Sequence, residues 1–293
     1  MLRGRATRPG AVPVGPDPSG HVDLVAARGD IEAVAQWASV TKLLVALAVL
    51  VQADRGCLDL DDPSGPPGST TRHLLSHASG LAPDSLEALS PPGRRRIYSN
   101  SGYQLLGELL EERSGGAEPD ATGVGRPSWA RIVSETVTEP LDMSTVVLPS
   151  DGSPAHSARG SVADLLELGG ELLLPRVLGA GLLETATEVA FPGLSGVVPG
   201  FGRYEECDWG LGFELKGSKV PHWTAPAGSP RTFGHFGRSG TFLWVDPDAG
   251  IACAAAGGAR FGPWATEEWP RFAEAVLEAW GPRRATGGTE TPG

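Results

Sequence analysis

Ser39 and Lys42 stand three residues apart, and an unbroken apolar run that ends at Val51 follows them. Only three of the 24 lysine and arginine residues are lysines, so a lysine at the edge of an apolar segment stands out. A buried lysine can lose its proton where an arginine cannot, and an uncharged amine can activate a neighbouring hydroxyl. The pair predicts a serine nucleophile. A helix-capping serine beside a lysine that extends to the surface is the structural alternative.

Residues 39–54 are predicted to form a helix that is apolar nearly all round and therefore central and buried. Residues at i and i+3 share one helix face, about 5–6 Å apart. The first turn of a helix also has free N–H groups and the positive end of the helix dipole. Ser39 thus stands where a developing oxyanion would be stabilised.

Tyr98 and Asn100 form a second candidate pair, placed between an arginine cluster and the expected start of a helix. A phenol whose pKa is lowered by a nearby ammonium group can relay a proton. The asparagine amide can hold either a substrate carbonyl or the Lys42 amine. The alternative is a packed tyrosine followed by an asparagine that caps the helix.

A third candidate is the glycine-rich segment 234–240, which contains His235, Gly237 and Arg238 next to an expected strand. Glycine allows another backbone or a ligand to approach closely. N–H groups near Gly237 and Arg238 would complete an oxyanion hole with that of Ser39. A glycine-rich hairpin with a hydrogen-bonded histidine is the structural alternative.

The remaining pattern predicts a strand near residues 21–27 and helices at 71–79, 101–113, 129–138 and 161–174. Strands at 209–215, 231–235, 240–246 and 250–256 and a helix at 267–280 complete it. We therefore predict an α+β fold in which an antiparallel sheet is flanked by helices. Residues 1–18 should be irregular, 19–282 one domain, and 283–293 a disordered tail. Within the domain, 19–55 and 191–282 would form the sheet part and 56–190 a mostly helical part, with the active site in the cleft between them.

Bulk properties exclude several functional classes. The net charge of -11 and the short run Arg94-Arg95-Arg96 do not indicate nucleic-acid binding. Three widely spaced cysteines indicate neither a disulfide framework nor a zinc site. Without an apolar signal segment or a membrane span, a cytoplasmic location is expected, and the oligomeric state is not readable.

Taken together, the motifs resemble the serine β-lactamase/penicillin-binding-protein superfamily, and specifically its class C-like branch. That branch includes family VIII esterases, D-aminopeptidases and acyltransferases. The resemblance covers roughly residues 30–257. It includes the S-x-x-K and Y-x-N motifs, the H-x-G motif, a stretch at 72–81 like "LLSHTSGL", a "PG…YSNxGY" segment at 92–103, and a "GLGW"-like segment at 209–213.

The resemblance implies roles for individual residues. Ser39 would be acylated, with Lys42 and Tyr98 sharing general acid and base work. Asn100, His235, Gly237 and Arg238 would bind and orient the substrate, with the N–H groups of Ser39 and Arg238 as the oxyanion hole. No metal or cofactor is implied. The i, i+4 pair His73 and His77, which has metal-binding spacing, is better explained as part of the family stretch.

One departure from the family pattern bears on the substrate. His235-Phe236-Gly237 replaces the lactamase K-T-G motif, and so removes a fixed charge and a hydroxyl that bind a carboxylate. This favours an esterase-like serine hydrolase acting on a small ester or amide. An acyltransferase in small-molecule biosynthesis uses the same site, and a non-catalytic penicillin-recognising module is the third reading.

Overall fold

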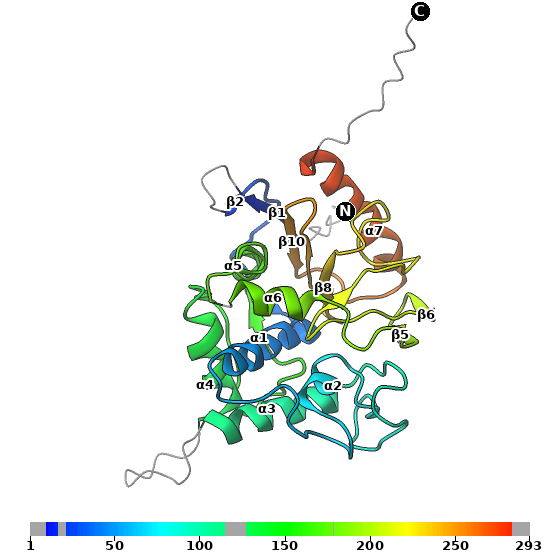
Figure 1. Ribbon diagram of the computed structural model, residues 1–293. Coiled ribbons are helices and arrows are strands. Elements are labelled where there is room, and N and C mark those ends of the chain that lie inside the picture. Colours follow the sequence, from blue (N-terminus) through cyan, green and yellow to red (C-terminus); the bar gives the residue numbers. More distant parts are fainter. Residues whose placement is uncertain (1–9, 17–21, 115–126, 178, 283–293) are drawn as a thin grey trace, which may run out of the picture.

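The structure, a computed structural model, describes residues 10–16, 22–114, 127–177 and 179–282. Its largest sheet has six strands in the order β2-β1-β10-β9-β8-β7, and each neighbouring pair is antiparallel. The strands are β1 (Gly10–Pro16), β2 (Val22–Leu24), β7 (Glu214–Leu215), β8 (Phe233–Phe236), β9 (Phe242–Asp246) and β10 (Ile251–Ala256). Strands from the two ends of the chain therefore build one sheet, as the α+β expectation requires (Figure 1).

The expectation of an irregular N-terminus is wrong for β1. Its glycines and prolines disfavour a strand locally, but the segment pairs with β10 over five positions, including Pro13 opposite Cys253. Tertiary pairing here overrides a weak local preference. The expected tail at 283–293 lies outside the described residues.

Helices cover both faces of the sheet, as Figure 1 shows. Alternate side chains of a strand point to opposite faces. Accordingly Phe242 and Trp244 pack with α7 (Pro263–Trp280), whereas Leu243 and Val245 belong to the core that includes α5 (Val162–Leu173). The sequence pattern places the segment of α5 in the helical part, but in the structure this helix packs directly on β10, β1 and β9.

Below α5 lies the helical half of the molecule, organised around α1 (Thr41–Asp54). The other elements are α2 (Thr71–Leu75), α3 (Asn100–Ser114), α4 (Trp129–Val133) with the π-helical turn η2 (Ser134–Thr138), and α6 (Ala180–Thr187). Every residue of the apolar run 43–51 is buried, which confirms the expected central helix. At Gly212, an added Cβ would come within 2.2 Å of the Ala46 Cβ, so glycine there lets the sheet part approach α1.

The segments around the sheet differ in detail from the sequence pattern. Only Glu214 and Leu215 of the expected strand 209–215 pair as β7, because Gly212 adopts a φ of +100° that interrupts extended backbone. Two small ladders were not expected. They are β3 (Ala35–Gln36) with β4 (Arg159–Gly160), and β5 (Gly196–Val198) with β6 (Gly202–Tyr204).

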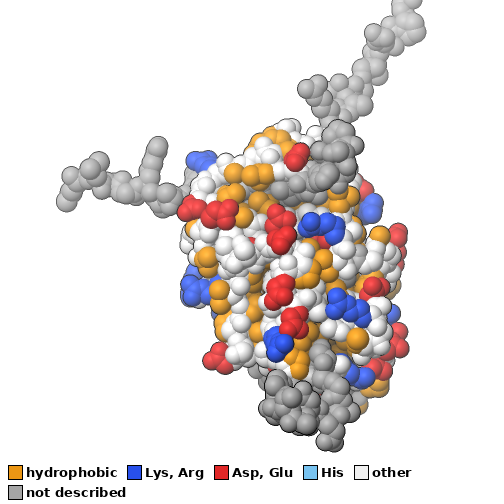
Figure 2. All heavy atoms as spheres, turned by 90° about the vertical axis from the view of Figure 1, so that its left-hand side faces the viewer, with side chains coloured by type: hydrophobic (Ala, Val, Ile, Leu, Met, Phe, Trp, Pro, Cys, Tyr) orange, Lys and Arg blue, Asp and Glu red, His pale blue; other side chains and the backbone are white. Residues whose placement is uncertain are grey.

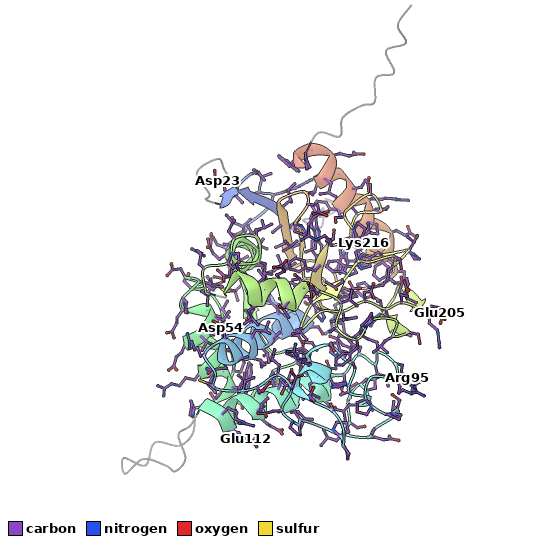
Figure 3. The ribbon with its side chains drawn as sticks, in the orientation of Figure 1. Asp23, Asp54, Arg95, Glu112, Glu205 and Lys216 are labelled. Atoms are coloured by element: carbon purple, nitrogen blue, oxygen red, sulfur yellow. The ribbon has the colours of Figure 1, made fainter. Side chains whose placement is uncertain are left out.

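Charge on the surface is dispersed. On the face shown in Figure 2, acidic and basic side chains are interspersed, with no continuous basic patch. In Figure 3, Arg95, Glu112 and Glu205 reach the periphery, whereas Lys216 lies among packed side chains. All three lysines, Lys42, Lys216 and Lys219, are in fact buried. Among the helices in the described ranges, none is long and apolar enough to cross a membrane.

Candidate active site

A cavity of about 700 Å³ opens between the sheet and the helical half, and its wall includes five of the seven predicted site residues. The lining residues from the sequence prediction are Ser39, Tyr98, Asn100, His235 and Arg238. Lys42 lies behind Ser39, fully buried. A volume of this size is typical of pockets for small molecules.

Ser39 is presented by a tight turn directly before the central helix. It lies in the 3₁₀ turn η1 (Ala38–Val40), and α1 begins two residues later at Thr41. Ala38 has a φ of +47°, a conformation that is costly for a residue with a Cβ. Strained backbone beside a half-buried serine is typical of functional positions, and it turns the serine toward the cavity.

Lys42 is held by three oxygen atoms. Its Nζ lies 2.7 Å from Asn100 Oδ1, 2.8 Å from the Ala155 carbonyl oxygen and 3.5 Å from Ser39 Oγ. Burial lowers the pKa of the Lys42 amine well below its usual value, although the charge of Asp84 acts in the opposite direction. The amine therefore has both the position and the tendency to be uncharged beside the Ser39 hydroxyl.

Tyr98 faces the same two groups. Its ring lies 4.8 Å from Lys42 Nζ, and the Ser39 side chain is near enough to lower the pKa of its hydroxyl. We expected a phenol with a lowered pKa, and this is wrong: burial raises the pKa of Tyr98 and outweighs the opposing effects of Ser39 and Arg238. Burial disfavours the charged phenolate more than the nearby Arg238 cation favours it. Tyr98 is thus a neutral phenol that can donate or pass on a proton.

His235 lies on the other side of Tyr98. Its Nε2 is 3.5 Å from the Tyr98 hydroxyl, and its Nδ1 is 2.7 Å from the carbonyl oxygen of Phe236. The carbonyl can only accept, so Nδ1 carries the proton and Nε2 faces the phenol as an acceptor. Burial lowers the pKa of His235 to about 3. The histidine is consequently neutral, in line with the loss of a fixed charge at this position.

Gly237 and Arg238 form the turn between β8 and β9. The Gly240 amide donates to the Gly237 carbonyl at 3.0 Å, which makes Arg238 the second residue of a tight turn. An added Cβ on Gly237 would lie 2.4 Å from the Trp37 carbonyl oxygen and 3.2 Å from the Ser39 amide nitrogen. Gly237 thus brings this turn against the serine backbone rather than lining the cavity, and it sets the Arg238 segment beside Ser39.

Comparisons with known proteins agree with this geometry. A family model described as Beta-lactamase matches residues 26–277. The chain belongs to the β-lactamase family. A crystal structure described as a β-lactamase from Mycobacterium bovis is similar to it with 44% identity and a TM-score of 0.85, covering 94% of this chain and 96% of that one.

More distant solved structures share the β-lactamase-like fold. A D-stereospecific amidohydrolase from Streptomyces sp. has 17% identity and a TM-score of 0.60, covering 90% of this chain and 94% of that one. A simvastatin synthase variant from Aspergillus terreus has 17% identity and a TM-score of 0.67, covering 94% and 91%. No curated protein matches the chain at a significant level of sequence similarity.

The site of this β-lactamase-family chain also contains residues that its sequence did not single out. Asp84 and His156 line the cavity, as do the arginines Arg159 and Arg260. Asp84 Oδ1 accepts a hydrogen bond of 2.7 Å from Asn100 Nδ2. Asp84, His156 and Arg260 lie in loops and Arg159 in the two-residue strand β4, so no periodicity marks any of them. The only signal for Asp84 was its place directly after the family stretch at 72–81.

His73 and His77 are held separately in this β-lactamase-family fold. The His73 ring stacks on that of Phe191, and its Nδ1 lies 3.0 Å from the Thr70 hydroxyl oxygen. His77 Nδ1 accepts a hydrogen bond of 3.1 Å from the Ser99 amide, next to Tyr98. His77 therefore fixes the backbone that presents the phenol.

Proposed function

We propose that the protein is a serine hydrolase that cleaves a small ester or amide through an acyl-enzyme on Ser39. The observation that carries the proposal is the environment of Lys42. Its fully buried amine has two acceptor oxygens within 2.8 Å and the Ser39 hydroxyl as its third neighbour. A neutral amine so placed donates its two N–H groups to Asn100 and Ala155 and keeps its lone pair for the hydroxyl proton.

In the acylation step, Ser39 Oγ attacks the substrate carbonyl carbon while its proton passes to Lys42. The Tyr98 phenol lies beside both groups, with its ring 4.8 Å from Lys42 Nζ, and can carry this proton between them. Negative charge then develops on the former carbonyl oxygen. The amides of Ser39, at the start of a helix, and Arg238, inside a tight turn, are available to stabilise it.

In the second half of the cycle, the proton now held by the Lys42–Tyr98 pair passes to the leaving alcohol or amine. A water molecule then takes the place of that group, loses its proton to the same pair and attacks the acyl carbon. The bond between the acyl carbon and Ser39 Oγ then breaks, the pair returns this proton to Oγ, and the acid is released. Because the phenol has a raised pKa, Tyr98 serves as a neutral donor and relay, while Lys42 is the base.

The surroundings of His235 support esters over carboxylate-bearing β-lactams. A neutral imidazole cannot form an ion pair with a carboxylate, and Phe236 has no hydroxyl to offer. The cavity wall also includes the apolar side chains of Phe236, Phe261 and Val198. We therefore propose an acyl group with apolar character.

Transfer to an acceptor other than water is the second candidate. The cavity of about 700 Å³ has room for an alcohol or amine beside the acyl group. A protein named simvastatin synthase shares this fold, and its name describes a synthetic enzyme rather than a hydrolase. Product analysis of p-nitrophenyl ester turnover with added alcohols or amines separates the two candidates: free acid identifies a hydrolase and a new ester or amide a transferase.

The deciding experiment is intact-mass analysis after treatment with a p-nitrophenyl alkylphosphonate. We expect one adduct, mapped to Ser39, together with loss of p-nitrophenyl acetate turnover. Ser39→Ala should take up no adduct and keep the wild-type melting temperature. Ser85→Ala, on an exposed loop, is the matched control and should react normally. Adduct formation on Ser39→Ala would assign the nucleophile elsewhere.

A further inference from the structure

The side-chain amide of Asn100 lies between a carboxylate and the proposed base. Its Nδ2 donates to Asp84 Oδ1 and its Oδ1 accepts from Lys42 Nζ, both at 2.7 Å. The backbone amide of Asn100 is also tied to this loop, because it donates to the Pro83 carbonyl at 2.7 Å. Asp84 itself is exposed on the cavity wall.

The two ends of an amide differ, since one only donates and the other only accepts. Against a protonated Lys42, only the oxygen end of Asn100 fits. Against a neutral Lys42 both orientations fit, because the amine then has a lone pair that could accept from Nδ2. In that reversed orientation, Asn100 would occupy the lone pair that must take the Ser39 proton.

We infer that Asp84 is a positioning residue that prevents this reversal and so keeps the lone pair of neutral Lys42 free for Ser39. A carboxylate only accepts hydrogen bonds, so a reversed Asn100 would place two oxygens against each other at hydrogen-bond distance. The inference rests on the proposed function, because it assigns Lys42 as the base. Asp84 acts through Asn100 and needs no contact with the substrate.

Asp84 also contributes a charge, which gives the test a second readout. Its negative charge favours protonated Lys42, so removing it should lower the pKa of that amine further. The other groups facing Lys42 are the phenols of Tyr98 and Tyr103 and three imidazoles. The imidazoles, those of His77, His156 and His235, all have lowered pKa values and are unchanged in the test variants.

The test compares wild type, Asp84→Asn, Asp84→Glu and the control Glu87→Gln in p-nitrophenyl acetate turnover from pH 5 to 10. Glu87 is an exposed acid on the same loop and does not line the cavity, so its variant removes the same charge without the contact to Asn100. Labelling with the alkylphosphonate is run on each protein. Because Asp84 is exposed, all variants should melt at the wild-type temperature.

We expect Asp84→Asn to lower kcat at least about tenfold with KM unchanged, since part of the general-base contribution is lost. The acid limb of the pH–rate profile of Asp84→Asn should move to lower pH. Asp84→Glu keeps a carboxylate that can only accept a hydrogen bond, so this variant should recover much of the wild-type rate. Glu87→Gln should behave as wild type. These outcomes together support the inference.

Three results would overturn it while leaving the proposed function in place. The first is an unchanged kcat in Asp84→Asn. The second is a raised KM with normal kcat in Asp84→Asn, which would indicate that Asp84 contacts the substrate. The third is an Asp84→Glu variant with a kcat no higher than that of Asp84→Asn. By contrast, a wild-type protein without an adduct on Ser39 would overturn the proposed function and this inference together.

Discussion

The Lys42 amine nitrogen lies 3.5 Å from the Ser39 hydroxyl oxygen, with the amine fully buried and the serine at the cavity wall. The distance is long for a hydrogen bond, as catalytic contacts often are before a substrate binds. It is short enough that the protonation state of one residue decides the nucleophilicity of the other. This relationship makes the activity dependent on pH in a direction that can be stated.

We predict that kcat/KM for p-nitrophenyl acetate rises with pH and reaches its plateau well below 10.5, the usual lysine value. The amine must be uncharged to accept a proton, and burial lowers its pKa. Activity should therefore be lost as the pH falls through the lowered pKa of Lys42. A rate that continued to climb until pH 10.5 would mean that Lys42 is solvated like an ordinary lysine.

Lys42→Arg should be as damaging as Lys42→Met, with a loss of kcat of about 10²–10⁴-fold, the usual range for general-base catalysis. Arginine keeps the charge but stays protonated, so it cannot take the Ser39 proton. Rates of phosphonate labelling check this without a turnover assay. If Lys42→Arg retained near-wild-type labelling, a base other than Lys42 would have to act.

The free energy of unfolding should also depend on pH through the lowered pKa of Lys42. An unfolded chain binds the Lys42 proton up to pH 10.5, whereas the folded protein releases it at lower pH. The wild type therefore gains stability as pH rises between these two values. In urea titrations from pH 7 to 10, we expect the free energy of unfolding of the wild type to rise relative to that of Lys42→Met. A difference independent of pH would show that the folded-state pKa is not lowered.

His235 should influence rate without setting the pH profile. Because its pKa is about 3, it is neutral throughout the working range. His235→Gln should change kcat for p-nitrophenyl acetate yet keep the acid limb where it is. His235→Lys, which introduces a cation at this wall, should increase nitrocefin hydrolysis relative to ester hydrolysis. An acid limb that moved in His235→Gln would identify the histidine as the titrating group.

A buried ion pair next to the cavity is predicted to hold β7 and its following loop. Glu214 binds Lys219 Nζ at 2.9 Å and His222 Nε2 at 2.8 Å. Burial alone would raise the pKa of Glu214, but His222 and Lys219 bring it to about 2. Lys219→Met should cost about 3–5 kcal/mol of unfolding free energy, because it leaves the buried Glu214 carboxylate without its lysine partner.

The matched control for that pair is Glu205→Gln, which breaks the exposed contact of 3.5 Å with Arg203 and should cost less than about 1 kcal/mol. In the wild type, the stability contributed by Glu214 is present above pH 4.5 and is lost as pH falls through about 2. Similar losses in the two variants would contradict a special role for the buried pair.

Much of the fold was readable because its strongest elements obey simple periodicities. The apolar run after Lys42 could only be a central helix, and Ser161 with Asp164 forms the capping box that begins α5. What the sequence could not give was set by tertiary contacts. β1 depends on its partner β10, and the packing of α5 on the sheet depends on how the chain returns across it.

The candidate site divides in the same way. Ser39, Lys42, Tyr98 and Asn100 carried chemical types and spacings that could be recognised, and the structure brings them together. The protonation of Tyr98 could not be read, because it depends on burial by segments distant in sequence. The sequence did not identify Asp84, because its role depends on its contact with the Asn100 amide, which only the structure shows.

The burial of every lysine has a practical consequence. Lys42, Lys216 and Lys219 are at most 5% exposed, so amine-directed reagents such as succinimidyl esters find no accessible lysine side chain in the folded protein. Dyes, cross-linkers and solid supports that rely on lysine acylation will therefore find no lysine to attach to while the protein stays folded. Conversely, slow appearance of labelled lysine reports transient opening of the structure. Each lysine would then give the opening rate of its own part of the molecule, resolved by peptide mapping.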